Sequence, residues 1–321
     1  MRARESHLYR DVPRRHEGID HTYSAWQSKS VTAADIIKEI KALPPDEQRR
    51  VLAEAIEEVS SHEPKETATL LQRAQRRLEH PEVPEDVWAR TQLLYVCSPD
   101  NPTGRVTTAD EWAFLFEMSD RYGFVIAADE CYSEIYFDEA KRPVGALAVA
   151  HARGRAGFPR LVSFGSLSKR SNAPGLRSGY VAGDAELLKA FLLYRTYHGS
   201  AMSPAVAAAS IAAWGDEAHV RANRVEYAAK FASLQPKVAD VLPCAMPDAA
   251  FYLWAKTPID DADFARRLLA EQAVTVLPGS FLARDAHGTN PGRGYVRIAL
   301  VAARHECAEA IDRILTLARS L

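Results

Sequence analysis

Between residues 91 and 183, short apolar runs alternate with helix-like segments, and this alternation constrains the fold more than any other feature. The apolar runs lie at residues 93–96, 124–128, 161–164 and 179–183. Runs of this length and composition are typical of buried strands. Strands that alternate with helices form a largely parallel sheet with crossover connections. The sequence therefore predicts the α/β class, with a helix at residues 109–122 that ends at Gly123.

Polar residues follow three of these runs: Asn101, Asp129 and Lys169. The carboxyl ends of parallel strands lie at one edge of a sheet, which is where the chemistry of such folds is found. A lysine at a strand end can form a Schiff base with an aldehyde, and a guanidinium such as that of Arg177 can hold a phosphate. Taken alone, residues 161–177 favour an ordinary strand end with a solvated lysine. Motifs elsewhere in the chain are needed to distinguish this from a Schiff-base lysine.

Composition excludes several classes of function. The chain has 321 residues, of which 47% are hydrophobic and 26% charged, as in globular proteins in solution. A net charge of −2 argues against a nucleic acid or an anionic membrane surface as partner. No apolar run is long enough to span a bilayer, and the basic N-terminus lacks the apolar segment of a secretory signal. The cysteines lie far apart, which predicts no metal site, no disulfide framework and a reducing cytoplasm.

The first 82 residues differ from the rest in their pattern of polar and apolar residues. Residues 1–30 are polar without a clear period and predict a loop or disorder. Residues 31–60 carry apolar side chains at helical spacing on both sides of a Pro-Pro-Asp break, which predicts an amphipathic helical hairpin. A third helical piece is expected at residues 66–78, and residues 80–84 resemble a linker. This helical appendage could bind a partner, but packing on another part of the protein is the commoner role.

After residue 183 the chain becomes helical and then mixed. Helices are expected at residues 185–197, 204–214, 217–241, 262–272 and 303–317. Strands are expected at residues 251–254, 274–277 and 295–300. The late mixture of strands and helices predicts a separate α+β domain of ordinary size. We therefore expect three regions: the appendage at 1–82, a sheet-containing domain at 83–240, and a small domain at 241–321.

Five motifs in order resemble those of one enzyme family. They are NPTG at 101–104, DECY at 129–132, SLSK at 166–169, Arg177, and YVRIAL at 295–300. Together they resemble the fold-type I pyridoxal-phosphate enzymes, and among them the class I/II aminotransferases, from about residue 83 to the C-terminus. Residues 276–284 and 288–292 look most like the bacterial succinyldiaminopimelate aminotransferases of lysine biosynthesis.

The resemblance implies pyridoxal 5'-phosphate as cofactor and a role for each matching residue. Lys169 would bind the cofactor aldehyde and, once displaced, move a proton between the substrate and the cofactor. Asp129 would keep the pyridine nitrogen protonated, which makes the ring an electron sink. Asn101 and Tyr132 would hydrogen-bond the ring hydroxyl.

The same resemblance implies three anion contacts and a reaction. Ser166 and Arg177 would hold the cofactor phosphate, and Arg297 would bind the substrate α-carboxylate through its planar fork. The reaction would be transamination between an amino acid and a 2-oxo acid, with N-succinyl-diaminopimelate and glutamate or 2-oxoglutarate as the expected pair. The family also implies a homodimer.

Simpler explanations exist for each residue. Asp129 could cap a turn, Tyr132 could pack in a core, and the Asn101 motif could be only a turn. Arg297 could be a surface charge on an edge strand. All of these would have to coincide in type and spacing to reproduce the family pattern.

The chain departs from the family before residue 91. Members carry there the first strands of the sheet, a phosphate-binding loop and an aromatic residue that stacks on the cofactor ring, and residues 1–90 match none of these. In the family's own strand order, a-g-f-e-d-b-c, the four strands found here would be d, e, f and g. We therefore expect a truncated large domain with two bare sheet edges and an incomplete cofactor site.

Two other functions remain open from the sequence. Many fold-type I enzymes share residues like Lys169 and Asp129, so a lyase or decarboxylase that acts on an amino acid would also fit. A catalytically silent remnant, acting at most as a binding module, would fit the missing phosphate loop.

Overall fold

The computed structural model describes residues 83–199, 201–286 and 288–321. The hairpin predicted at 31–60 and the helix predicted at 66–78 lie outside these residues. The chain divides after Val83 into two units, and every element below belongs to the second, Pro84–Leu321.

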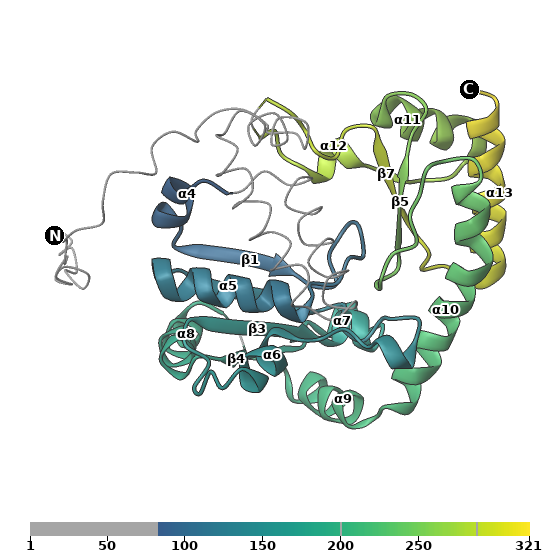
Figure 1. Ribbon diagram of the computed structural model, residues 1–321. Helices are drawn as coiled ribbons and strands as arrows, with labels where there is room; N and C mark the ends of the chain where they lie inside the picture. The colour runs from purple at the N-terminus through teal and green to yellow at the C-terminus, as the bar shows by residue number, and fades with distance from the viewer. Residues whose placement is uncertain (1–82, 200, 287) are drawn as a thin grey trace, which may run out of the picture. The chain divides into compact units, whose positions relative to one another are not determined.

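The first sheet has four strands, in the order β1-β2-β3-β4 (Figure 1). They are β1 (Leu93–Cys97), β2 (Val125–Asp129), β3 (Leu161–Ser166) and β4 (Gly179–Gly183). The first three run parallel, and β4 pairs with β3 in the antiparallel direction. The predicted α/β class with a mostly parallel sheet is confirmed, as is the contiguous set of four strands.

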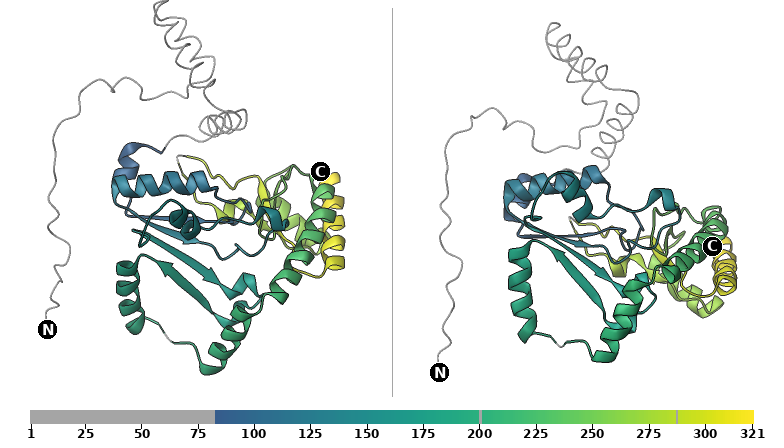
Figure 2. Two further views of the ribbon diagram at one scale, coloured as in Figure 1. Left: turned by 60° about the horizontal axis from the view of Figure 1, so that its bottom comes forward. Right: turned by 90° about the horizontal axis from the view of Figure 1, so that it is seen from below.

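Helices connect these strands and extend beyond them. They are α4 (Glu85–Arg90), α5 (Ala109–Tyr122), α6 (Ala146–Ala152), α7 (Leu167–Arg170), α8 (Ala185–Tyr197) and α9 (Pro204–Gly215). Helices α5 and α6 share one core with strands β2 and β3, where Trp112, Phe116 and Ile126 are buried. Figure 2 shows α5 on one side of the sheet and α8 and α9 on the other. None of the helices that the structure describes is both long and apolar enough to cross a membrane.

Local signals explain why α5 forms where it does. Thr108 and Glu111 form a capping box, in which each side chain accepts a hydrogen bond from the other's backbone N–H, at 3.3 and 2.8 Å. At the other end Gly123 adopts φ +81°, which a residue with a side chain rarely tolerates. The predicted bounds of this helix are therefore correct.

The C-terminal part is built on a three-stranded antiparallel sheet. Its elements are α10 (Ala218–Ala239), β5 (Tyr252–Lys256), α11 (Asp261–Gln272), β6 (Leu277–Pro278), α12 (Gly279–Leu282), β7 (Tyr295–Ala299) and α13 (Arg304–Arg319). The strand order is β5-β7-β6, and α10 packs beside α13 (Figure 1). The small domain predicted from residue 241 stays a prediction, although α10 ends close to that boundary.

The core of this part contains residues of α10, of strands β5 and β7, of α13 and of the loop after β2. Tyr132 and Ile135 come from that loop and are buried together with Phe231 of α10, Leu253 of β5 and Ile311 of α13. The loop that follows Asp129 is therefore fixed by packing against the C-terminal sheet.

Truncating Leu253 should destabilise the protein strongly. The side chain is 0% exposed, so Leu253→Ala leaves a cavity and should lower the free energy of unfolding by about 2–5 kcal/mol. Leu193→Ala, at a side chain that is 63% exposed, should change it by less than about 0.5 kcal/mol. Urea denaturation followed by circular dichroism measures both. Equal midpoints for the two variants would contradict the burial of β5.

The outer edges of the first sheet are β1 and β4, and no other strand in the described part of the chain pairs with them. Helix α8, which follows β4, has no buried residue. Its most exposed apolar side chains are Leu192, Leu193, Tyr194 and Tyr197. The bare ends of the sheet stay a prediction, because residues 1–82 lie outside the part of the chain that the structure describes.

Some predicted elements differ from the structure. The strand predicted at 274–277 is shorter, because only Leu277 and Pro278 pair with β7. Helix α6 lies within residues for which no element was predicted. Helix α4 follows directly on the predicted linker. Both helices are short, and neither has a side-chain cap that would mark its start.

Candidate functional site

The carboxyl ends of β1, β2 and β3 bring the predicted residues to one edge of the sheet. Asp129 is the last residue of β2 and is in register with Cys97 of β1 and Phe164 of β3. Lys169 lies in α7, which begins directly after β3. Asn101 lies in the loop that leaves β1. The expectation from strand order is thus met for these three residues.

The loop after β1 is held by its own polar groups. The Asp100 carboxylate accepts hydrogen bonds from the backbone N–H of Thr103 at 2.9 Å and of Arg105 at 3.2 Å. Gly104 has φ +71°, and a Cβ there would lie 2.4 Å from the carbonyl oxygen of Ala249. Only glycine fits this close approach, which ties the Asn101 loop to the segment that precedes β5.

Asp129 sits between two cysteines that stay neutral. Its Oδ1 accepts a hydrogen bond from the backbone N–H of Cys131 at 3.1 Å. Burial, with the Asp129 carboxylate adding to it, raises the pKa of Cys97 to about 11 and that of Cys131 to about 12. Both thiols are therefore protonated at neutral pH, and neither provides a thiolate nucleophile here.

The amine of Lys169 lies among aromatic rings. Its Nζ is 5.2 Å from the ring centroid of Phe251 and 5.8 Å from that of Tyr132. It forms no hydrogen bond or ion pair with any residue that the structure describes. A half-buried lysine without a partner is chemically available, in contrast to Lys230, whose amine donates to the carbonyls of Leu300 and Ala302.

A chain of contacts leads from Lys169 to Arg297. The hydroxyls of Tyr132 and Tyr252 lie 2.8 Å apart, and the guanidinium of Arg297 stacks 4.4 Å from the Tyr252 ring centroid. Arg297 also donates from Nη1 to Oδ1 of Asn101 at 2.6 Å. Burial and the hydrogen bond with Tyr252 raise the pKa of Tyr132 far above its ordinary value, so this phenol remains neutral.

Arg297 has a buried donor that no described residue uses. It lies on β7, the middle strand of its sheet, so the edge-strand explanation is wrong. Its Nε is buried and has no hydrogen-bond partner among the described residues. A buried donor without an acceptor costs free energy, which an incoming anion would recover.

Ser166 and Arg177 are placed differently. The Ser166 hydroxyl accepts from the backbone N–H of Ser168 at 3.1 Å and lies at the start of α7, close to Lys169. Arg177 is exposed, has φ +50° and donates to the carbonyl of Pro174 at 2.9 Å. No contact within the described residues joins Arg177 to the other predicted site residues.

Two aromatic residues of the site were not predicted. The sequence predicts only a strand at residues 251–254, yet Phe251 lies beside Lys169 and Tyr252 links Tyr132 to Arg297. The pairing of β5 with β7 brings them there. No local sequence signal reports this pairing, because it joins segments about forty residues apart.

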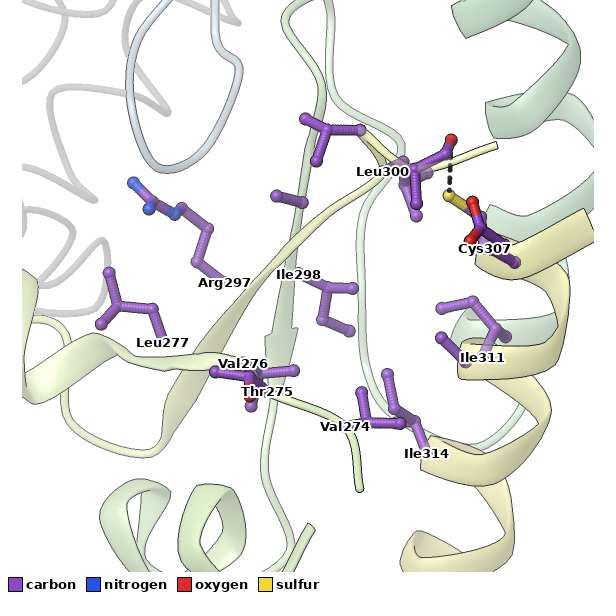
Figure 3. Close-up of a pocket in the computed structure, with 15 residues that line it drawn as sticks. Val274, Thr275, Val276, Leu277, Arg297, Ile298, Leu300, Cys307, Ile311 and Ile314 are labelled. Carbon is purple, nitrogen blue, oxygen red and sulfur yellow. Dashed lines mark hydrogen bonds between the residues drawn. The ribbon is translucent and has the colours of Figure 1, made fainter. Parts of the chain in front are cut away.

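A separate cavity of about 450 Å³ lies in the C-terminal part (Figure 3). Residues 274–277, strand β7 and helix α13 line it, and most of the side chains are aliphatic. Arg297 lies at its margin, but Lys169, Asp129 and Asn101 do not line it. This cavity is therefore distinct from the edge of the first sheet. Among the described residues, no His, Cys, Asp and Glu side chains are grouped to hold a metal.

Comparison with known proteins decides the family. The sequence model of the family "Aminotransferase class I and II" matches residues 29–314. The chain belongs to this family. The match reaches into residues 29–82, in which we recognised no family motif, and the character of that segment stays a prediction. Class I and II aminotransferases depend on pyridoxal phosphate, so the resemblance and its cofactor are confirmed at the level of the family.

Several aminotransferases are similar to this chain. The LL-diaminopimelate aminotransferase of Nitratidesulfovibrio vulgaris (strain DP4) is 34% identical over 239 residues, which cover 73% of this chain and 59% of the relative. A crystal structure of an aminotransferase from Neisseria meningitidis has a TM-score of 0.70 and 57% identity over 74% of this chain and 60% of that one. A probable N-succinyldiaminopimelate aminotransferase from Thermus thermophilus has a TM-score of 0.64 and 28% identity over 73% and 61%. The chain thus spans about 60% of the length of these relatives.

The described residues fit part of a pyridoxal-phosphate site. The unpartnered Lys169 amine suits an aldehyde, and the unpartnered Nε of Arg297 suits a carboxylate. Asp129, Asn101 and Tyr132 could contact the ring, and Ser166 could contact the phosphate. Arg177 would have to leave the Pro174 carbonyl to take part.

Proposed function

We propose that the chain carries the reacting residues of pyridoxal-phosphate-dependent amino transfer. One observation supports this most: an unbroken chain of contacts in space runs from Lys169 to Arg297. It passes through Tyr132 and Tyr252, and Arg297 in turn contacts Asn101. Asp129 lies at the same edge of the sheet, at the end of β2. An ordinary strand-end lysine would be solvated and would have no such surroundings.

Each residue has a chemical task in this proposal. When bound, pyridoxal phosphate supplies an aldehyde for covalent attachment and a ring that accepts the electrons released at the substrate Cα. Lys169 attaches the cofactor and, when free, moves the proton at Cα. Asp129 holds a proton on the ring nitrogen. The neutral Tyr132 hydroxyl and the Asn101 amide donate hydrogen bonds to the oxygen of the ring hydroxyl. Arg297 binds the α-carboxylate of the amino acid.

For the substrate we propose an amino acid of the diaminopimelate type, with glutamate and 2-oxoglutarate as the second pair. Two similarities support it: to an LL-diaminopimelate aminotransferase and to a probable N-succinyldiaminopimelate aminotransferase. We favour N-succinyl-diaminopimelate because residues 276–284 and 288–292 resemble the succinyldiaminopimelate aminotransferases. Lysine biosynthesis, a cytoplasmic location and a homodimer belong to the same proposal.

Half-reactions test the function directly. The full chain, loaded with pyridoxal phosphate, is mixed with N-succinyl-diaminopimelate or with LL-diaminopimelate. Amino transfer should leave the aminated cofactor and release a keto acid, whereas a lyase would release ammonia and a decarboxylase carbon dioxide. If only LL-diaminopimelate reacts, we would conclude that it, and not N-succinyl-diaminopimelate, is the substrate. No reaction with either compound or with glutamate would overturn the proposal for this chain.

Arg297→Met should impair substrate binding specifically. Methionine retains the apolar contact with Tyr252 but removes the charged donor, so kcat/KM for an amino acid should fall by about 10²- to 10³-fold. The effect should vanish for a primary amine that lacks the carboxylate. Arg304→Met is the matched control, because this arginine pairs with Glu226 at the surface. Equal losses with and without the carboxylate would exclude the proposed role.

A further inference from the structure

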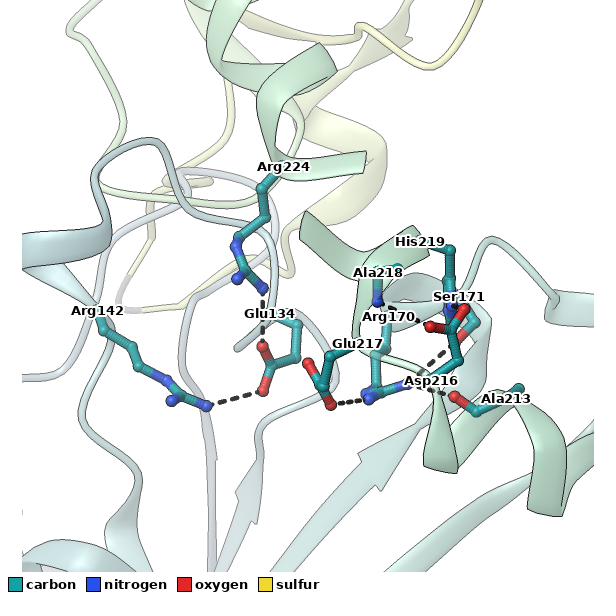
Figure 4. Close-up of polar contacts among 10 residues, drawn as sticks. All are labelled: Glu134, Arg142, Arg170, Ser171, Ala213, Asp216, Glu217, Ala218, His219 and Arg224. Carbon is teal, nitrogen blue, oxygen red and sulfur yellow. Dashed lines mark hydrogen bonds and ion pairs between the residues drawn. The ribbon is translucent and has the colours of Figure 1, made fainter. Parts of the chain in front are cut away.

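The residue that follows Lys169 is a buried arginine with several partners. Arg170 is 6% exposed, whereas Lys169 is partly exposed. Its Nη1 donates to the carbonyl of Ala213 at 2.7 Å, its Nη2 forms an ion pair with Glu217, and its guanidinium lies 5.1 Å from the ring centroid of Trp214. These partners come from the end of α9 and the start of α10 (Figure 4).

A second set of contacts joins the same two segments. The Ser171 hydroxyl lies 2.8 Å from Nε2 of His219, whose Nδ1 lies 2.7 Å from Oδ2 of Asp216. One residue further on, Asn172 donates from its amide to Asn223 at 2.9 Å. The first two residues after Lys169 are thus bound to the α9–α10 junction, as Figure 4 shows, and the third is bound to α10 itself.

Helix α10 also anchors the loop that carries Tyr132. Arg224 is buried and forms ion pairs with Glu134 at 3.2 Å and with Glu139 at 2.8 Å (Figure 4 shows the first). One helix therefore holds both the turn of Lys169 and the loop of Tyr132. The Lys169 amine and the Tyr132 ring, 5.8 Å apart, thus lie on two segments that α10 contacts.

Helix α7 needs such support. It has four residues, and a helix of one turn is not stable by itself in water. Neighbouring residues on a helix point in directions about 100° apart, so fixing the orientation of α7 through Arg170 also fixes the direction of the Cα–Cβ bond of Lys169. A buried guanidinium destabilises a protein unless it is paired. Apart from a long contact with the adjacent Ser171 hydroxyl at 3.4 Å, the partners of Arg170 belong to or flank the α9–α10 junction.

We propose that Arg170 is a positioning residue for Lys169, with Glu217 as its ion-pair partner and the Ser171–His219 contact as a second tie. The inference rests on the proposed function of Lys169 as the residue that attaches the cofactor. Arg170 itself reaches away from the lysine amine, toward α9 and α10, so it acts through the orientation of α7.

Covalent attachment measures this role. Full-length wild type, Arg170→Ala, Arg170→Lys and Glu217→Gln are titrated with pyridoxal phosphate, reduced with borohydride, and the modified Lys169 peptide is quantified by mass spectrometry. Arg170→Ala should raise the half-saturating concentration about tenfold. Arg170→Lys keeps the positive charge but loses the planar fork, and Glu217→Gln removes the charge of the half-exposed partner, so each should raise the half-saturating concentration about threefold. The absorbance band of the attached cofactor changes with pH, and the midpoint of this change should also shift. The shift should be largest in Arg170→Ala and smaller in Arg170→Lys and Glu217→Gln.

Arg155 offers a matched control. It also forms an ion pair, with Asp120, stacks 5.0 Å from a ring centroid, that of Phe116, and donates to a carbonyl, that of Pro159, at 3.1 Å. Arg155→Ala should therefore cost similar stability but change the half-saturating concentration by less than about twofold. If Arg170→Ala and Arg155→Ala behave alike, the positioning role is overturned while the proposed function stands.

Hydrogen exchange separates the two proposals. In the cofactor-free protein, amides of residues 167–173 should exchange faster in Arg170→Ala and in Glu217→Gln than in wild type, because the turn has lost its ties. If the wild type attaches no cofactor, the proposed function fails, and this exchange alone tests whether Arg170 orders the Lys169 turn. Unchanged exchange in both variants would overturn the positioning role.

Discussion

Lys169→Ala should leave the chain unable to attach pyridoxal phosphate. Attachment requires an unprotonated primary amine that reaches the aldehyde, and the Lys169 amine lies beside Tyr132 and Phe251 without a hydrogen-bond partner in the described part of the chain. Because it makes so few polar contacts, its loss should change the free energy of unfolding by less than about 0.5 kcal/mol. The absorbance of the attached cofactor and the mass of the borohydride-reduced protein measure the result.

A lysine outside the site serves as control. Lys256, exposed at the end of β5, should be replaceable by alanine without loss of the absorbance band. Peptide mapping of the reduced wild type should locate the modification at Lys169 alone. A label that persists in Lys169→Ala would assign the attachment to another amine and refute the role given to this residue.

Asp129→Asn should separate attachment from chemistry. The amide cannot keep the ring nitrogen protonated, so amino transfer should slow by about 10²- to 10³-fold. Attachment at Lys169 should persist, because it does not depend on the ring nitrogen. Stopped-flow absorbance of the half-reaction, with a saturating amino acid, measures the rate.

Asp184→Asn controls for the loss of a carboxylate at a strand end. Asp184 follows β4, which runs against β3, and it caps α8 through the N–H groups of Glu186 at 2.9 Å and Leu187 at 3.2 Å. Asp184→Asn should lower the free energy of unfolding, and its half-reaction rate should stay within about twofold of the wild-type rate. If both variants transfer the amino group at the wild-type rate, Asp129 has no part in the chemistry.

Much of the fold could be predicted because its signals are local. The capping box of Thr108 and Glu111 and the left-handed Gly123 mark the ends of α5, and α8 matches its predicted range. The alternation of strands with helices predicted a largely parallel sheet, and the resemblance to the family supplied the contiguous order of the four strands. Helix α6 was missed because its seven residues, mostly alanine, provide neither a period nor a capping side chain.

The site was predictable only in part. Asn101, Asp129 and Lys169 follow successive strands, so their shared edge follows from sheet topology. The contact between Arg297 and Asn101 depends on how the second sheet packs against the loops of the first, across 196 positions of sequence. The same applies to the tie between Arg170 and Glu217, because nothing near residue 170 in sequence indicates where α10 begins.

The exposed helix α8 has a consequence for handling the protein. Helix α8 exposes apolar side chains beside an edge of β4 with which no strand of the described residues pairs: Leu192, Leu193, Tyr194 and Tyr197. A net charge of −2 provides little repulsion between molecules. Leu→Lys changes at Leu192 and Leu193 should therefore reduce association between molecules at high concentration, without touching the site.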